Sequence, residues 1–160
     1  MQDIRIEPLT LEYLDGVVAV EEACFPIPWT REDFLREITT NQMAIYRVAL
    51  VDGQVAGFAG MWHIINEGHI TNIAVREEYR GHKLGERLLL ALFDAAREKE
   101  MIGITLEVRM GNAPAQALYA KHGFKAEGIR KKYYAETGED AIIMWRYFPG
   151  PAETDEEGSH

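Results

Sequence analysis

Apolar and polar positions alternate along most of the first half of the chain and recur at helical spacing farther on. Alternation is typical of strands that bury one face, whereas apolar residues three or four positions apart mark one face of a helix. Alternating or continuous apolar runs predict strands over residues 4–6, 43–51, 54–65, 68–75, 102–108, 124–134 and 141–148. Helical spacing predicts helices over residues 11–25, 83–100 and 112–121, and another that begins after Thr30.

Short polar signals separate these elements. Thr10 and Thr30 stand at N-cap positions, and Asp33 completes a weak capping box with Thr30. Asp52-Gly53 is a dipeptide favoured in two-residue hairpin turns. The resulting order is β-α-α-β-β-β-α-β-α-β-β. It predicts a single α/β domain over residues 1–148, with a central mixed, mostly antiparallel sheet flanked by helices.

The amino-acid composition predicts in which compartment the protein works. The chain has 160 residues, of which 47% are hydrophobic and 27% charged, as in ordinary proteins with a water-facing surface and one core. No apolar run approaches the ~20 residues that cross a bilayer, so no membrane partner is expected. The first residues lack a signal-peptide pattern, and Cys24 is the single cysteine. Together these features favour a reducing, cytoplasmic location.

The charge balance is acidic, with 17 Lys and Arg against 26 Asp and Glu and a net charge of -9. This argues against general nucleic-acid binding, which depends on neutralising phosphates. Much of the excess lies in residues 149–160, which we expect to form a disordered acidic tail. Its last residues, Gly158-Ser159-His160, look like the start of a purification tag.

The segment Arg80-Gly81-His82-Lys83-Leu84-Gly85 carries the first sign of chemistry. It joins a strand to an amphipathic helix, and the free N–H groups at a helix start form an anion site. Arg80, His82 and Lys83 add positive charge, which suits a pyrophosphate. The alternative is a tight strand–helix connection with solvated basic residues. The spacing matches neither a Walker loop nor a Rossmann fingerprint.

Together with Asn72-Ile73-Ala74-Val75, this segment resembles the acetyl-CoA-binding motif of the Gcn5-related N-acetyltransferases, Arg/Gln-x-x-Gly-x-Gly/Ala. The predicted order of elements is also that family's, so the resemblance covers nearly the whole domain. It implies that acetyl-CoA is bound by Arg80, Gly81, His82, Lys83, Leu84 and Gly85. One position departs from the motif, because Lys83 stands where an inner glycine is usual.

Three further stretches narrow the resemblance. Residues 106–124, residues 129–144 and the loop Cys24-Phe25-Pro26-Ile27-Pro28-Trp29-Thr30 are similar to the subfamily that acetylates the N-terminal alanine of bacterial ribosomal protein S18. The implied activity is transfer of acetyl from acetyl-CoA to a protein N-terminal amine by direct attack in a ternary complex. The implied partner is the N-terminus of ribosomal protein S18 or a similar peptide.

The resemblance assigns two catalytic roles. Glu107, near the end of a buried-type strand, becomes the base that takes the proton of the amine, directly or through water. Tyr119, on the following helix, becomes the general acid toward the CoA sulfur. From the residues alone, a salt-bridged glutamate is the favoured interpretation of Glu107. A packed helix tyrosine is about as well supported for Tyr119 as a catalytic acid. Asn112 is an evident N-cap, to which the resemblance adds a hydrogen bond to CoA.

The resemblance also assigns backbone and groove positions. It implies that backbone groups of Ile73, Ala74 and Val75 bind the pantetheine arm and polarise the thioester carbonyl of acetyl-CoA. A plain buried strand accounts for the same residues. Aromatic residues are assigned to the peptide groove, and each is individually more often a core residue than a ligand. These are Phe25, Trp29, Tyr133 and Tyr134.

No metal site is expected, since His63 and His69 lack a carboxylate–histidine ligand spacing. Two other functions stay open. One is acetylation of lysine, a polyamine or another small amine. The other is a non-catalytic module that only binds acyl-CoA. The presence of both Glu107 and Tyr119 argues against the module, and nothing in the pattern indicates an oligomeric state.

Overall fold

The strands of the computed structural model, which describes residues 2–135 and 137–149, form one seven-stranded sheet with the order β1-β2-β3-β4-β5-β7-β6. All neighbouring strands are antiparallel except β4 and β5. The expected α/β class and mixed, mostly antiparallel sheet are therefore confirmed. The strands are β1 (Ile4–Pro8), β2 (Ala44–Val51), β3 (Gln54–Ile64), β4 (Glu67–Val75), β5 (Gly103–Arg109), β6 (Lys125–Tyr134) and β7 (Glu139–Tyr147).

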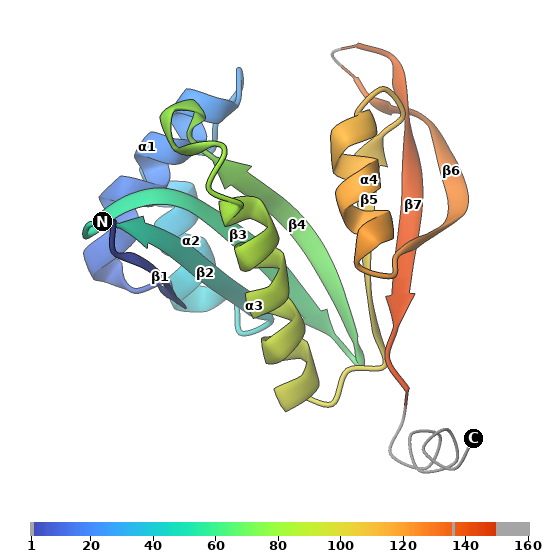
Figure 1. Cartoon of the computed structure of the whole chain (residues 1–160), viewed down its shortest axis with the longest axis horizontal. Coiled ribbons are helices and arrows are strands. Elements are labelled where there is room, and N and C mark those ends of the chain that lie inside the picture. Colours follow the sequence, from blue (N-terminus) through green and yellow to red (C-terminus); the bar gives the residue numbers. More distant parts are fainter. Residues whose placement is uncertain (1, 136, 150–160) are drawn as a thin grey trace.

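Four α-helices and two short 3-10 turns connect the strands (Figure 1). The helices are α1 (Leu14–Cys24), α2 (Arg31–Thr40), α3 (Leu84–Glu98) and α4 (Ala113–Lys121), and the turns are η1 (Leu11–Tyr13) and η2 (Glu77–Tyr79). The expected acidic tail over residues 149–160 lies outside the described residues from 150 onward.

Alternation along β2 explains how the sheet is covered on both faces. Val48 and Leu50 pack with α1 and α2, whereas Ala49 and Val51 pack with α3. Successive side chains of a strand point to opposite faces, so one apolar run supplies two cores. Figure 1 shows α3 on one side of β2–β4 and α1 and α2 on the other.

The helix starts follow the expected capping in two of three cases. Thr30 accepts from Asp33 N, and the Asp33 carboxylate accepts from Thr30 N, which completes the capping box. Asn112 caps α4 by accepting from Ala115 N. Thr10 stands at the N-cap position of η1, and its carbonyl accepts from Tyr13 N, but its side chain makes no capping hydrogen bond.

Candidate functional site

The two parallel strands at the centre of the sheet separate after a short contact. Only Glu67–His69 of β4 and Gly103–Thr105 of β5 are paired. The β3–β4 register shifts just beyond, between Ile70 and Asn72, which leaves Thr71 as a bulge. A bulge bends its strand, so β4 turns away from β5 (Figure 1). A cleft of about 240 Å3 occupies the opening, lined by Phe25, Ile70, Thr71, Asn72, Ile73, Leu106, Glu107, Val108, Arg109, Asn112, Ala115, Tyr119 and Tyr134.

Glu107 projects into this cleft because of its parity on β5. Leu106 and Val108 are buried in the core shared with α3, so Glu107 lies on the opposite face of the strand. Its side chain is 26% exposed, and Oε2 lies 3.3 Å from Nε of Arg130 on β6. Glu107 is therefore ion-paired, as one interpretation of the sequence expects, and it lines the cleft. Its role as the base stays a prediction.

Tyr119 faces the same cleft from α4. The helix begins at the Asn112 cap, and its Ala115 and Tyr119 pack on the main core. The Tyr119 ring contacts the Phe124 ring at a centroid distance of 5.7 Å. Burial raises the pKa of the Tyr119 hydroxyl, so the phenol keeps its proton at neutral pH. The structure thus places a carboxylate and a protonated phenol around one cleft.

Tyr134 reaches the cleft through an irregularity in β6. The β6–β7 register shifts between Arg130 and Tyr134, and Lys132 within this bulge has φ of 52°. The Arg109 guanidinium then lies 3.9 Å from the centre of the Tyr134 ring. Arg109 also pairs with Glu139 at 3.4 Å, which fixes the guanidinium over the ring. Sequence reasoning missed Arg109, although its position two residues after Glu107 indicates the same face of β5.

Arg130 is a second residue that sequence reasoning missed. Its run Arg130-Lys131-Lys132 is typical of a solvated face, and the side chain is indeed half exposed. However, Ala141 of β7 pairs with Arg130 of β6 on one side and with Arg109 of β5 on the other. Arg130 therefore lies in the same row of the sheet as the end of β5. No local pattern carries that adjacency, so no signal in the sequence places Arg130 at Glu107.

Two of the expected groove aromatics lie outside the cleft lining. Trp29 packs edge-on against Phe34, with ring centroids 5.2 Å apart, and lines a separate cavity along α2. Tyr133 is exposed and packs against Tyr134 at 5.1 Å. Phe25 and Tyr134 do line the cleft, so the structure brings together two of the four aromatics.

The end of β4 is only partly open to a ligand. Ile73 lines the cleft, whereas Ala74 is buried in the core beneath α1 and α2. The Val75 carbonyl accepts from Arg80 Nε at 3.3 Å and from the Cys24 thiol at 3.5 Å. Arg80 therefore folds back onto the strand end in this structure.

The loop before α3 has the shape of an anion cradle. Gly81 has φ of 96° and Lys83 has φ of 58°, so Lys83 adopts at the helix N-cap a left-handed conformation that glycine adopts more easily. The N–H groups of the first turn of α3 have no acceptor within the helix. A Cβ built on Gly85 meets no protein atom within 4 Å. Neither packing nor backbone angle requires this glycine, and the helix start beside it is open to a ligand.

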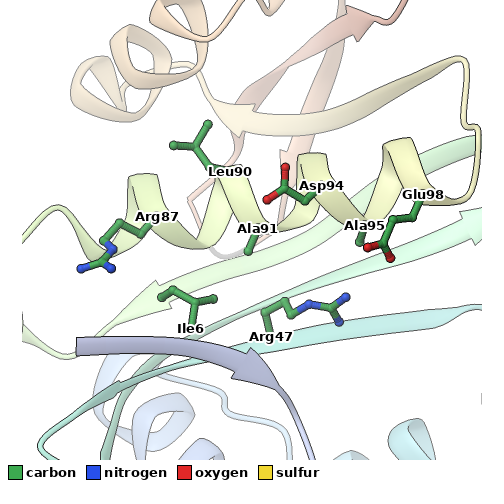
Figure 2. A pocket seen from close by; sticks show the side chains of 8 residues that line it. All are labelled: Ile6, Arg47, Arg87, Leu90, Ala91, Asp94, Ala95 and Glu98. Carbon is green, nitrogen blue, oxygen red and sulfur yellow. The ribbon is translucent and has the colours of Figure 1, made fainter. Parts of the chain in front are cut away.

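A second depression lies along the other side of α3 (Figure 2). It measures about 400 Å3 and is larger than the cleft between β4 and β5. Its lining contains two arginines, Arg47 and Arg87, two carboxylates, Asp94 and Glu98, and the apolar residues Ile6, Leu90, Ala91 and Ala95. This mixture favours no single ligand charge, and none of the catalytic candidates lines it. The smaller cleft is therefore the candidate active site.

Within residues 2–135 and 137–149, no group of three or more His, Cys, Asp or Glu side chains is placed to hold a metal ion. In the same part of the chain, no helix combines the length and apolarity needed to cross a membrane. His69 instead lies 3.0 Å from the Glu67 carboxylate as a local pair.

Comparison with known proteins gives consistent results. A Bacillus subtilis (strain 168) protein, named as a candidate [ribosomal protein bS18]-alanine N-acetyltransferase, is 44% identical over 140 residues, which cover 88% of this chain and 93% of the relative. The [ribosomal protein bS18]-alanine N-acetyltransferase of Escherichia coli (strain K12) is 34% identical over 143 residues, 87% of this chain and 94% of the relative.

Solved structures agree. The crystal structure of the ribosomal-protein-S18-alanine N-acetyltransferase from Escherichia coli matches with a TM-score of 0.83 and 30% identity, over 93% of this chain and 97% of that one. The profile described as "Acetyltransferase (GNAT) family" matches residues 14–124. The separated β4 and β5 and the loop before α3 agree with these matches. The matches show that the chain belongs to the acetyltransferase (GNAT) family.

Proposed function

We propose that this acetyltransferase acts on a protein N-terminal α-amine, with the N-terminal alanine of ribosomal protein S18 as the principal substrate. The observation that carries the proposal is the meeting of Glu107 and Tyr119 around one cleft between β4 and β5. Relatives of known name that share most of this chain act on the same alanine. A cytoplasmic location, which the single Cys24 supports, is part of this proposal.

The residues present fit acetyl-CoA, the acetyl donor of this family. The first turn of α3, with Gly85 and the preceding Gly81 and Lys83, holds the diphosphate through backbone N–H groups. Ile73 on the open edge of β4 and Asn112 at the start of α4 lie along the cleft that takes the pantetheine arm. Acetyl-CoA supplies a thioester whose carbonyl carbon accepts the amine.

The chain's own groups handle the protons. Glu107 takes a proton from the ammonium, directly or through water, and the neutral nitrogen forms the new N–C bond. The C–S bond breaks, and Tyr119 gives its hydroxyl proton to the departing sulfur. The nitrogen loses its second proton as the amide forms. That proton returns through water to Tyr119, and Glu107 releases its own proton to the solvent. No acyl-enzyme forms in this sequence of steps.

A single carboxylate base matches an α-amine better than a lysine. An α-amine has a pKa near 8, whereas the lysine amine has a pKa of about 10.4. At pH 7 roughly a tenth of the α-amine is already neutral, against well under a thousandth of the lysine. The ion pair with Arg130 holds the Glu107 carboxylate at the cleft.

A peptide panel tests this function. Peptides that begin with alanine, and matched peptides with a blocked N-terminus and an internal lysine, are incubated with acetyl-CoA and read by mass spectrometry. We expect acetyl transfer to the free α-amine and faster transfer to the N-terminal sequence of ribosomal protein S18 than to scrambled versions. Acetylation of lysine or spermidine alone would favour the small-amine alternative. Binding of acetyl-CoA without transfer to any amine would favour the non-catalytic module.

Replacing Gly85 with glutamate should weaken acetyl-CoA binding about 10- to 30-fold. The added carboxylate repels the phosphate and takes up the stabilisation, up to ~2 kcal/mol, that this helix N-terminus offers an anion. A Cβ added at Gly85 meets no other part of the protein within 4 Å beyond its chain neighbours and the backbone of its own helix, so the fold should be retained. Isothermal titration calorimetry measures the affinity, and Gly85→Ala is the control with a small side chain. An affinity of Gly85→Glu equal to that of Gly85→Ala would contradict a phosphate at this position.

A further inference from the structure

The two halves of the sheet share one hydrophobic core, but their strands are paired only briefly at the centre. In one half, α3 packs on β1–β4. The other half contains β5, α4, β6 and β7 in chain order. Between the halves, β4 and β5 pair over only three residues each. A polar contact bridges the halves elsewhere. Glu86, in the first turn of α3, accepts from Nε2 of His122 at 2.6 Å and from Nζ of Lys121 at 2.8 Å, at the end of α4.

The contact between Glu86 and His122 is largely shielded from water. Both side chains are 16% exposed, whereas Lys121 is mostly exposed. The hydrogen bonds from Lys121 and His122 lower the pKa of Glu86 to about 2, so the carboxylate is charged at neutral pH. A hydrogen bond to a charged acceptor is about twice as strong as a neutral one. Phe93 closes one side, with its ring 6.3 Å from that of His122.

His122 is in turn connected to the candidate acid. The carbonyl of Tyr119 accepts from the backbone N–H groups of His122 and Phe124, both at 3.0 Å. The side chain of Phe124 also packs on the Tyr119 ring. A short chain of contacts therefore runs from Glu86, next to Gly85 in the phosphate cradle, through His122 to the backbone of Tyr119.

We propose that Glu86 is a positioning residue that sets the distance between the phosphate cradle of α3 and the hydroxyl of Tyr119. CoA has a bounded length between its diphosphate and its sulfur, so a diphosphate fixed at α3 places the sulfur correctly only if α4 is held at a matching distance. The inference rests on the proposed function, because it acts through Tyr119 as the acid.

The first test separates turnover from binding. Glu86→Ala should lower kcat about 10-fold, since displacing a reacting group by a fraction of an ångström costs one to two orders of magnitude. Acetyl-CoA affinity should be unchanged or higher, because a negative charge beside the phosphate site is removed. Glu86→Gln, which keeps the shape and one hydrogen bond, should fall between Glu86→Ala and wild type.

The matched control is Asp94→Asn, which removes a carboxylate from the same helix. Asp94 is 79% exposed on its side chain and pairs with Arg97 of its own helix, so kcat should stay within twofold of wild type. Circular dichroism and thermal melts check that each variant is folded. If Glu86→Ala does not fold, Glu86→Gln carries the comparison.

The second test is a double-mutant cycle with Tyr119→Phe. If Glu86 acts through the Tyr119 hydroxyl, Glu86→Ala should lower kcat less than twofold in a Tyr119→Phe background. A further 10-fold loss in that background, or a wild-type kcat for Glu86→Ala and Glu86→Gln, would overturn the inference. Both results leave the proposed function intact, since wild-type turnover on α-amine peptides is measured separately. If the peptide panel identifies another amine as the acceptor, kcat in the double-mutant cycle is measured with that amine.

Discussion

Tyr119→Phe should lower kcat about 100-fold while leaving acetyl-CoA affinity nearly unchanged. The change keeps the ring that packs on Phe124 and removes only the hydroxyl. General acid catalysis contributes about 10²- to 10⁴-fold, and without it the sulfur must leave as a thiolate. Burial already raises the pKa of Tyr119 above that of a free tyrosine, so the wild-type phenol stays protonated through pH 9. Steady-state kinetics with an alanine peptide measure kcat, and calorimetry measures the affinity.

Tyr147→Phe is the matched control for this prediction. Tyr147 is an exposed tyrosine of β7 whose hydroxyl donates to Glu127, outside the cleft lining. The same chemical change there should leave kcat within twofold of wild type. If Tyr119→Phe behaved like Tyr147→Phe, departure of the sulfur would need no acid from Tyr119, and the role assigned to this residue would be wrong.

Glu107→Gln should lower kcat/KM about 100-fold at pH 7, because glutamine keeps the size of the side chain but cannot take a proton. The loss should shrink as the pH rises toward 9. The α-amine has a pKa near 8, so at higher pH most of the substrate is neutral without help from the enzyme. Arg130 loses its charged partner but is more than half exposed, so the free energy of unfolding should change little. Rates measured from pH 6.5 to 9 give the profile.

Glu127→Gln makes the same change on β6 at a residue that bonds Tyr147 and does not line the cleft. Its pH profile should overlay that of wild type. A Glu107→Gln profile that also overlays wild type would show that bulk water or another group removes the proton. A uniform loss at every pH would indicate that Glu107 orients the substrate rather than accepting its proton.

Local patterns were sufficient for most of the fold. The alternation in β2, the Asp52-Gly53 turn and the Thr30 capping box each act over a few residues, and the structure contains all three. Asp52 and Gly53 both have positive φ, as a tight hairpin turn of this kind requires. At Thr10 the chain begins with the 3-10 turn η1 before α1, a common start for an α-helix, and the Thr10 side chain makes no capping hydrogen bond.

Side chains that meet across strands were harder to predict. Arg130 reaches Glu107 because β7 lies between β5 and β6, and Trp29 turns onto Phe34 instead of into the cleft. Both placements depend on which elements are neighbours in space. The sequence around such residues resembles that of an ordinary surface run or of a buried aromatic residue. Their contacts across the sheet therefore could not be predicted from it.

The sequence by itself determined the elements, their order, the glycine loop before α3 and the place of Glu107 near the end of a strand. Each of these depends on contacts within one turn or one strand. The tertiary structure alone decided that β4 and β5 separate after three residues each, that Arg130 reaches Glu107, and that Glu86 reaches His122. These features join segments far apart in the chain, and their free energy comes from packing and charge pairing that exist only once the sheet has assembled.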